Sequence, residues 1–60
     1  MTLPEAAIIA RNVRDGHADM YTTAELRRAH KTFVRWGDGP DDEHDRHTLD
    51  HALFARGGDW

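Results

Sequence analysis

Glycine residues divide the chain into three stretches, and in each of them apolar side chains recur every three or four positions. This spacing places the apolar side chains on one face of an α-helix and differs from the alternation of a β-strand. Gly16, Gly37 and Gly57 directly follow the three stretches, in the position where glycine commonly ends a helix. The predicted helices cover about residues 3–15, 23–36 and 40–56, and residues 57–60 form a tail. Because the connections are short, we expect a single all-α domain, either a small three-helix bundle or a helical hairpin with a loosely packed extra helix.

Capping residues mark where these helices begin. Thr2 and Glu5 have the spacing of a capping box, in which each side chain satisfies a backbone N–H of the other residue. Thr22 and Glu25 repeat the same spacing before the second helix. Pro40 fits the first position of the third helix, where its missing N–H costs little.

The predicted core is thin for a chain of 60 residues. Its side chains are Leu3, Ala6, Ile9, Ala10 and Val13 in the first helix, Leu26, Ala29, Phe33 and Trp36 in the second, and Leu49, Ala52 and Leu53 in the third. Ile8 lies off this stripe, so the first helix is expected to contact neighbours on more than one side. A chain of this length buries only roughly 60% of its unfolded surface, and without cysteine no disulfide stabilises it. We therefore expect it to associate with itself or with another protein.

The composition argues against several classes of function. The chain contains neither serine nor cysteine to act as a nucleophile and has no glycine-rich phosphate loop, so we predict that it is not an enzyme and takes no cofactor. No stretch approaches the roughly 20 apolar residues of a membrane span, and the N-terminus lacks the pattern of a secretory signal. We expect a cytoplasmic protein with no membrane partner. The net charge of −3 gives no general attraction to nucleic acid.

Aromatic and acidic side chains favour the main functional prediction, a surface that binds another protein. Trp36 ends a helix, Trp60 ends the chain, and Phe54 falls outside the apolar stripe of the third helix. At least one of these aromatic side chains is expected to be partly exposed, and exposed aromatics near arginine are typical of interface anchors. The predicted partner-binding residues are Trp36, Phe54, Trp60, Asp41, Asp42 and Glu43. The sequence thus suggests a small accessory or regulatory protein, such as a phage or bacterial modulator of a host protein, or a homo-oligomer.

A basic second helix offers an alternative function, binding to nucleic acid. Its basic residues are Arg27, Arg28, Lys31 and Arg35, each able to neutralise one phosphate. The segment Met20–Leu26 resembles the opening of helix-turn-helix domains of the excisionase and MerR type, and Thr32–Trp36 resembles their recognition helix. The resemblance implies a DNA-binding, helix-turn-helix-like protein, although it covers less than a third of the chain and lacks the turn that separates these two elements in that family. A simpler interpretation is that the basic second helix and the acidic third helix attract each other.

Three histidines on the third helix give a further alternative. His44, His47 and His51 fall within about 60° of one helical face, roughly opposite Leu49 and Leu53, and are expected to point outward. The last two histidines are one turn apart, a spacing that allows two nitrogens to chelate Zn²⁺, Ni²⁺ or Cu²⁺. The same cluster would sense pH, because positive charges accumulate there below about pH 6.5. The plainest interpretation is a solvated helix face.

Overall fold

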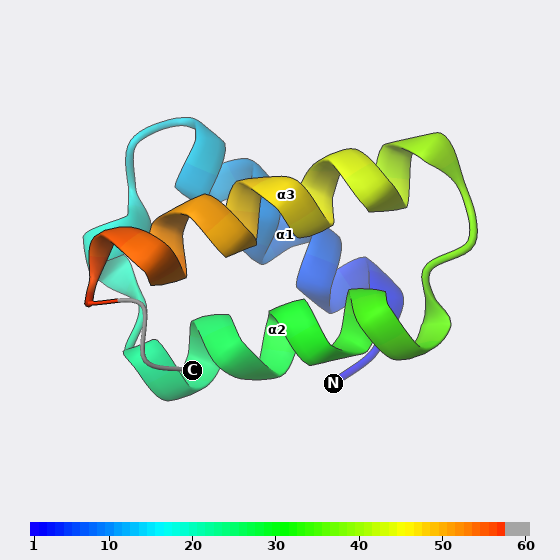
Figure 1. The fold of residues 1–60 in the computed structure, drawn as a ribbon, viewed down its shortest axis with the longest axis horizontal. Helices are drawn as coiled ribbons and strands as arrows, with labels where there is room; N and C mark the ends of the chain where they lie inside the picture. The colour runs from blue at the N-terminus through cyan, green and yellow to red at the C-terminus, as the bar shows by residue number, and fades with distance from the viewer. Residues whose placement is uncertain (58–60) are drawn as a thin grey trace.

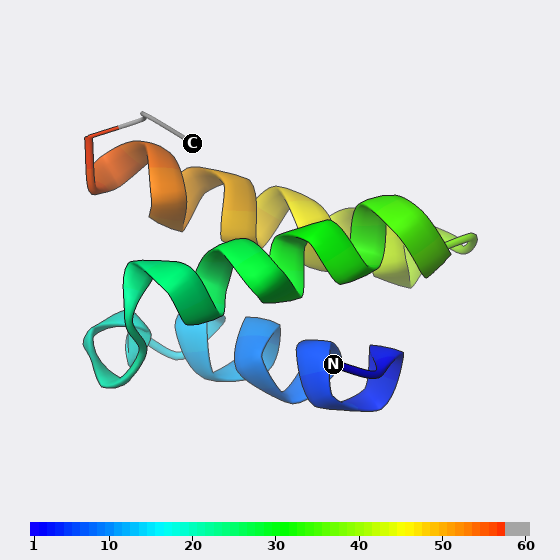
Figure 2. The same cartoon turned by 90° about the horizontal axis from the view of Figure 1, so that it is seen from below.

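Three helices and one short 3₁₀ turn make up the computed structural model, which describes residues 1–57 (Figure 1). The elements are α1 (Leu3–Arg14), η1 (Ala18–Met20), α2 (Thr23–Trp36) and α3 (Pro40–Ala55). α2 runs opposite to both α1 and α3, and every helix packs against the other two (Figures 1 and 2). The predicted all-α fold is confirmed as a bundle of three helices. α2 has the predicted bounds, whereas α1 and α3 each end one residue earlier than expected.

Both predicted capping boxes are present at the helix starts. The Thr22 hydroxyl accepts a hydrogen bond from the Glu25 backbone N–H at 3.1 Å, and the Glu25 carboxylate accepts one from the Thr22 N–H at 2.9 Å. Thr2 and Glu5 make the equivalent bonds at 3.4 and 3.3 Å. The Thr2 hydroxyl also donates to the Glu5 carboxylate at 2.9 Å; this bond, followed by that from the Thr2 N–H, lowers the pKa of Glu5. The pKa of Glu25 is lowered first by the Thr22 N–H and then by the Thr22 side chain, because hydrogen bonds to a carboxylate stabilise its ionised form. Local sequence therefore defines where α1 and α2 begin.

Two glycines end helices for different physical reasons. Gly16 has φ +92°, a left-handed conformation that glycine adopts without the steric cost of a Cβ. Gly37 instead has an extended backbone, with φ −71° and ψ 135°. A Cβ on Gly37 would lie 2.6 Å from the Phe33 carbonyl oxygen and 3.0 Å from the Asp42 Cβ. The turn between α2 and α3 therefore requires glycine because of close packing rather than because of backbone conformation.

The core lies where the three helices meet. Its buried side chains are Ala6, Ile9 and Ala10 from α1, Leu26, Ala29 and Phe33 from α2, and Leu49 and Leu53 from α3. The three alanines are fully buried and let the helices approach closely, while the leucines fill the centre. Leu3, Val13 and Ala52 pack at its edge, as the predicted stripes require. Within residues 1–57, no helix combines the length and apolar character needed to cross a membrane.

The sequence-based core is wrong at Trp36. This side chain is 60% exposed, although its angle around the helix falls among those of the buried Ala29 and Thr32, because it sits on the last residue of α2, beyond the last buried position of the stripe. Thr32, which is not part of the predicted core, is buried instead. The Thr32 hydroxyl donates a hydrogen bond to the Arg28 carbonyl at 2.9 Å, which removes the cost of burying an unsatisfied polar group.

The expectation for Ile8 is also wrong. Its side chain is 59% exposed and does not belong to the core. It points away from the bundle because it lies about 200° around α1 from the fully buried Ala6. One face of α1 thus contacts both neighbouring helices.

Arg56 joins the end of α3 to the connector between α1 and α2. Its guanidinium donates to the carbonyl oxygens of Ala18 at 2.7 Å and Tyr21 at 2.8 Å, and to the Thr23 hydroxyl at 3.2 Å. Arginine suits this position because its planar fork carries several donors at fixed angles.

Candidate functional site

The acidic start of α3 does not form one surface. Asp41 lines a hollow together with the arginines of α1, whereas Asp42 and Glu43 line a different hollow beside the α2–α3 turn. The carboxylate of Asp42 also accepts a hydrogen bond from the Asp38 backbone N–H at 3.3 Å. Successive helical residues are about 100° apart, so three consecutive acids spread over about 200° of the helix surface and divide between two hollows. The predicted acidic patch is therefore dispersed.

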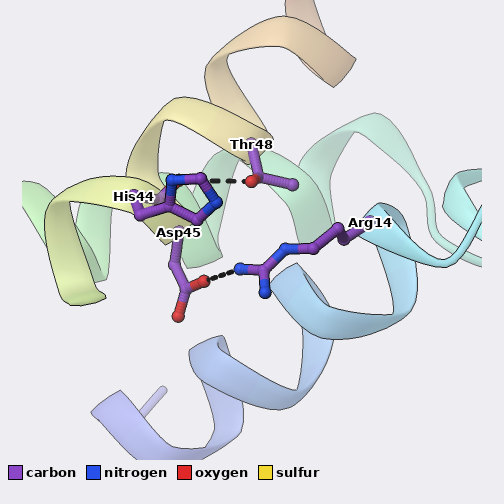
Figure 3. A network of polar contacts seen from close by, with 4 residues as sticks. All are labelled: Arg14, His44, Asp45 and Thr48. Carbon is purple, nitrogen blue, oxygen red and sulfur yellow. Dashed lines mark hydrogen bonds and ion pairs between the residues drawn. The ribbon is translucent and has the colours of Figure 1, made fainter.

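Asp45 uses its charge to join two helices. Its carboxylate forms an ion pair with Arg14 of α1, and in the next turn the Thr48 hydroxyl donates to the His44 carbonyl oxygen at 3.2 Å (Figure 3). The Asp45 side chain is 16% exposed and that of Arg14 is 47% exposed. Part of the acidic charge of α3 thus serves packing rather than binding.

His30 and Asp50 make a second polar contact, between α2 and α3. The His30 Nε2 lies 3.4 Å from the Asp50 Oδ1, and the His30 side chain is only 13% exposed. Burial lowers the pKa of His30, the nearby Asp50 carboxylate opposes this shift, and Arg46 adds to it. Sequence reasoning missed His30, although its position four residues after Leu26 marks the edge of the buried stripe.

The four basic residues of α2 do come together. Arg27, Arg28, Lys31 and Arg35 are all exposed and share an arc of about 100° on the outer face of the helix. Three of them line a hollow of about 560 Å³ on that face, which we call the basic hollow. Its lining residues are Ala24, Arg27, Arg28, His30, Lys31 and Val34. Among the described residues no carboxylate lines it, and Val34 is 60% exposed there.

The two described aromatic anchors lie far apart. Trp36 ends α2 next to the α2–α3 turn, whereas Phe54 lies in the last turn of α3. Most of the length of α3, about 20 Å, separates these two positions. Both side chains are exposed, 60% for Trp36 and 74% for Phe54, which confirms the prediction of exposed aromatics. Trp60 lies outside the described residues.

Trp36 has an intramolecular contact of its own. The Arg35 guanidinium lies 5.3 Å from the centre of its ring, within the range of a cation–π interaction. This contact orients the fourth basic side chain of α2 toward the aromatic ring. Arg35 is also absent from the lining of the basic hollow.

The three predicted histidines are exposed but divide between two hollows. His44 lines a hollow with Arg11, Arg14 and acids of α3, whereas His47 and His51 line one with Asp50 and Phe54. In the described part of the chain, no group of three or more histidine, cysteine, aspartate or glutamate side chains is arranged to hold a metal ion. The sequence-predicted trio is therefore a pair plus a separate histidine.

The two segments that resemble helix-turn-helix domains occupy one helix. Met20–Leu26 covers the end of η1 and the start of α2, and Thr32–Trp36 is the end of the same α2. α2 is continuous between them, so the turn expected between these elements is not formed. Comparison with protein-family models, curated proteins and solved structures gave no significant match for this chain.

Proposed function

We propose that this chain is a small accessory or regulatory protein that acts in the cytoplasm by binding another protein through the basic hollow on α2. The observation that supports this proposal is the composition of the hollow. An exposed valine, Val34, lies among Arg27, Arg28 and Lys31, with no described carboxylate in the lining. Such a surface complements a partner segment that combines acidic with apolar side chains.

The apolar and charged groups of the basic hollow contribute in different ways. Covering Val34 with a partner side chain contributes up to about 1.5 kcal/mol. The basic side chains at the rim attract carboxylates, which raises the association rate and the specificity more than the affinity. The surface is small beside the roughly 800 Å² that each partner buries in a standard interface. We therefore expect a transient complex, with a dissociation constant of roughly 1–100 µM.

Binding to nucleic acid is the second candidate. The observation that favours it is the exposed arc of Arg27, Arg28, Lys31 and Arg35, because each side chain can neutralise a phosphate. The net charge of −3 opposes it, as does the Glu43 carboxylate on the neighbouring helix. An apolar side chain in the basic hollow also contributes more to binding a protein than to binding a phosphate backbone. The protein partner is therefore the better-supported occupant.

A peptide-binding experiment tests the proposal. The probe is a fluorescent amphipathic peptide of about 15 residues, with leucine on one face and glutamate on the other. We expect it to bind, and a matched peptide with lysine in place of glutamate not to bind. Reversing two charges (Arg28→Glu with Lys31→Glu) is expected to weaken binding at least tenfold, about 1.4 kcal/mol.

The matched control for the apolar contribution is Ile8, because its exposure equals that of Val34 within one per cent. Val34→Asp is expected to weaken peptide binding, whereas Ile8→Asp on α1 leaves it unchanged. A DNA duplex serves as the competing probe. Salt-sensitive DNA binding without peptide binding would favour a nucleic-acid-binding function. Binding of neither probe would rule out both proposed functions.

A further inference from the structure

We infer that His47 and His51 form half of a site for a divalent transition metal, and that a second copy of this chain completes it. Both side chains are exposed and lie one helical turn apart on α3. Together with Asp50 and Phe54 they line a hollow of about 390 Å³. Zn²⁺ is the reference metal, because neutral imidazole is one of its preferred ligands, at 2.0–2.1 Å from the metal.

A second copy is needed because one chain has too few ligands. Zinc sites are typically tetrahedral, with four protein ligands in a structural site. Among residues 1–57 no single group supplies even three such side chains. Asp50 is directed toward α2, where its Oδ1 lies 3.4 Å from His30. His44 lines a different hollow, beside the cationic Arg11 and Arg14. Two copies related by a two-fold axis would bring two histidine pairs together, which gives four imidazoles.

Phe54 supports the same arrangement. It is the most exposed large apolar side chain in the described part of the chain, at 74%. His47, His51 and Phe54 share about 60° of arc on α3, so a partner helix that meets the histidines also covers the phenylalanine. Two-fold symmetry places the same residues on both sides of the contact. The hollow therefore offers metal ligands and an apolar contact side by side.

Charge makes the metal necessary for this dimer. Each chain carries a net charge of −3, so two copies repel each other. A shared divalent cation offsets part of this repulsion and fixes the register of the two α3 helices. We therefore expect association to depend on the metal and not on Phe54 alone.

Sedimentation velocity and calorimetry with Zn²⁺ alone test the inference. We expect a monomer in EDTA, and a dimer that forms at one Zn²⁺ per two chains. His47→Ala and His51→Ala should each weaken Zn²⁺ binding at least tenfold and abolish the dimer. His44→Ala, one turn earlier on the same helix, is the matched control. It should still bind Zn²⁺ and still form the dimer. Helical circular dichroism verifies that each variant is folded.

Two further variants separate the apolar contact from metal binding and from the proposed function. Phe54→Asp should weaken the dimer while the histidine pair still binds Zn²⁺. Val34→Asp, in the basic hollow, should leave the Zn²⁺-dependent dimer intact. The inference is overturned by a dimer that persists in EDTA, by one Zn²⁺ per chain without a change in mass, or by an affinity weaker than about 100 µM.

Discussion

At the scale of single residues, His30 should make stability depend on pH. Its pKa is lowered in the folded protein from 6.5, so the unfolded chain binds the proton more readily. The contribution of His30 to stability is therefore most favourable above about pH 6.5 and becomes less favourable as the pH drops below that value. Two charged groups of α3 act on this shift: the Asp50 carboxylate opposes it and Arg46 adds to it. Burial is the largest cause of the shift.

Urea unfolding of His30→Gln between pH 7.5 and 5.5, with EDTA present, measures this contribution. The loss of stability on acidification should be smaller in His30→Gln than in the wild-type chain. Asp50→Asn removes the opposing carboxylate and should make the loss larger than in the wild type. Equal pH dependence in all three proteins would show that His30 titrates alike in the folded and unfolded states.

Gly37 gives a second prediction at the residue scale. Gly37→Ala should destabilise the fold by about 1–3 kcal/mol, because the new Cβ meets the Phe33 carbonyl oxygen and the Asp42 Cβ. Gly39→Ala, two positions later, is the control, since its Cβ meets nothing within 4 Å. Thermal unfolding of both variants measures the difference. A Gly37→Ala protein as stable as Gly39→Ala would contradict the close packing of this turn.

At the scale of elements, Arg56 should hold the α1–α2 connector against α3. Arg56→Ala removes donors to Ala18, Tyr21 and Thr23, so we expect faster amide exchange in η1 and a loss of about 1–2 kcal/mol. Arg56→Lys should restore little of this stability, because one ammonium group does not reproduce the planar set of donors of a guanidinium. Hydrogen exchange followed by mass spectrometry reports on η1 directly. Unchanged exchange in η1 would mean that this connector is held by other contacts, such as the hydrogen bond of Asn12 to the Tyr21 hydroxyl at 2.6 Å.

The elements themselves were largely predictable, and their contacts were not. Capping boxes and Pro40 are local signals, which is why the helix starts agree with the sequence analysis. The pair of Arg14 and Asp45 joins residues 31 positions apart, so no local pattern reveals it. Likewise, the exposure of Trp36 depends on where the core ends in space. The four bases of α2 were identifiable because one helix carries them all.

At the scale of the whole molecule, some charged side chains lie on the outer surface of the bundle and others lie in the contacts between helices. Asp45 and Asp50 face cationic or titratable partners on other helices, so two of the five acidic side chains of α3 are used within the fold. The bases of α2 point outward on a single face. A chain with a net charge of −3 can therefore present a locally cationic surface. This arrangement explains how an acidic protein would recognise an acidic partner segment.

The central claim is that the basic hollow binds an acidic and apolar segment of a partner protein. The most direct test follows the NMR chemical shifts of the backbone amides of this chain while the glutamate-leucine peptide is added. We predict that the largest changes fall on the outer face of α2, between Ala24 and Val34. Charge reversal at Arg28 and Lys31 should abolish these changes. Changes centred on α1 or at the Phe54 end of α3, or no changes at all, would contradict the claim.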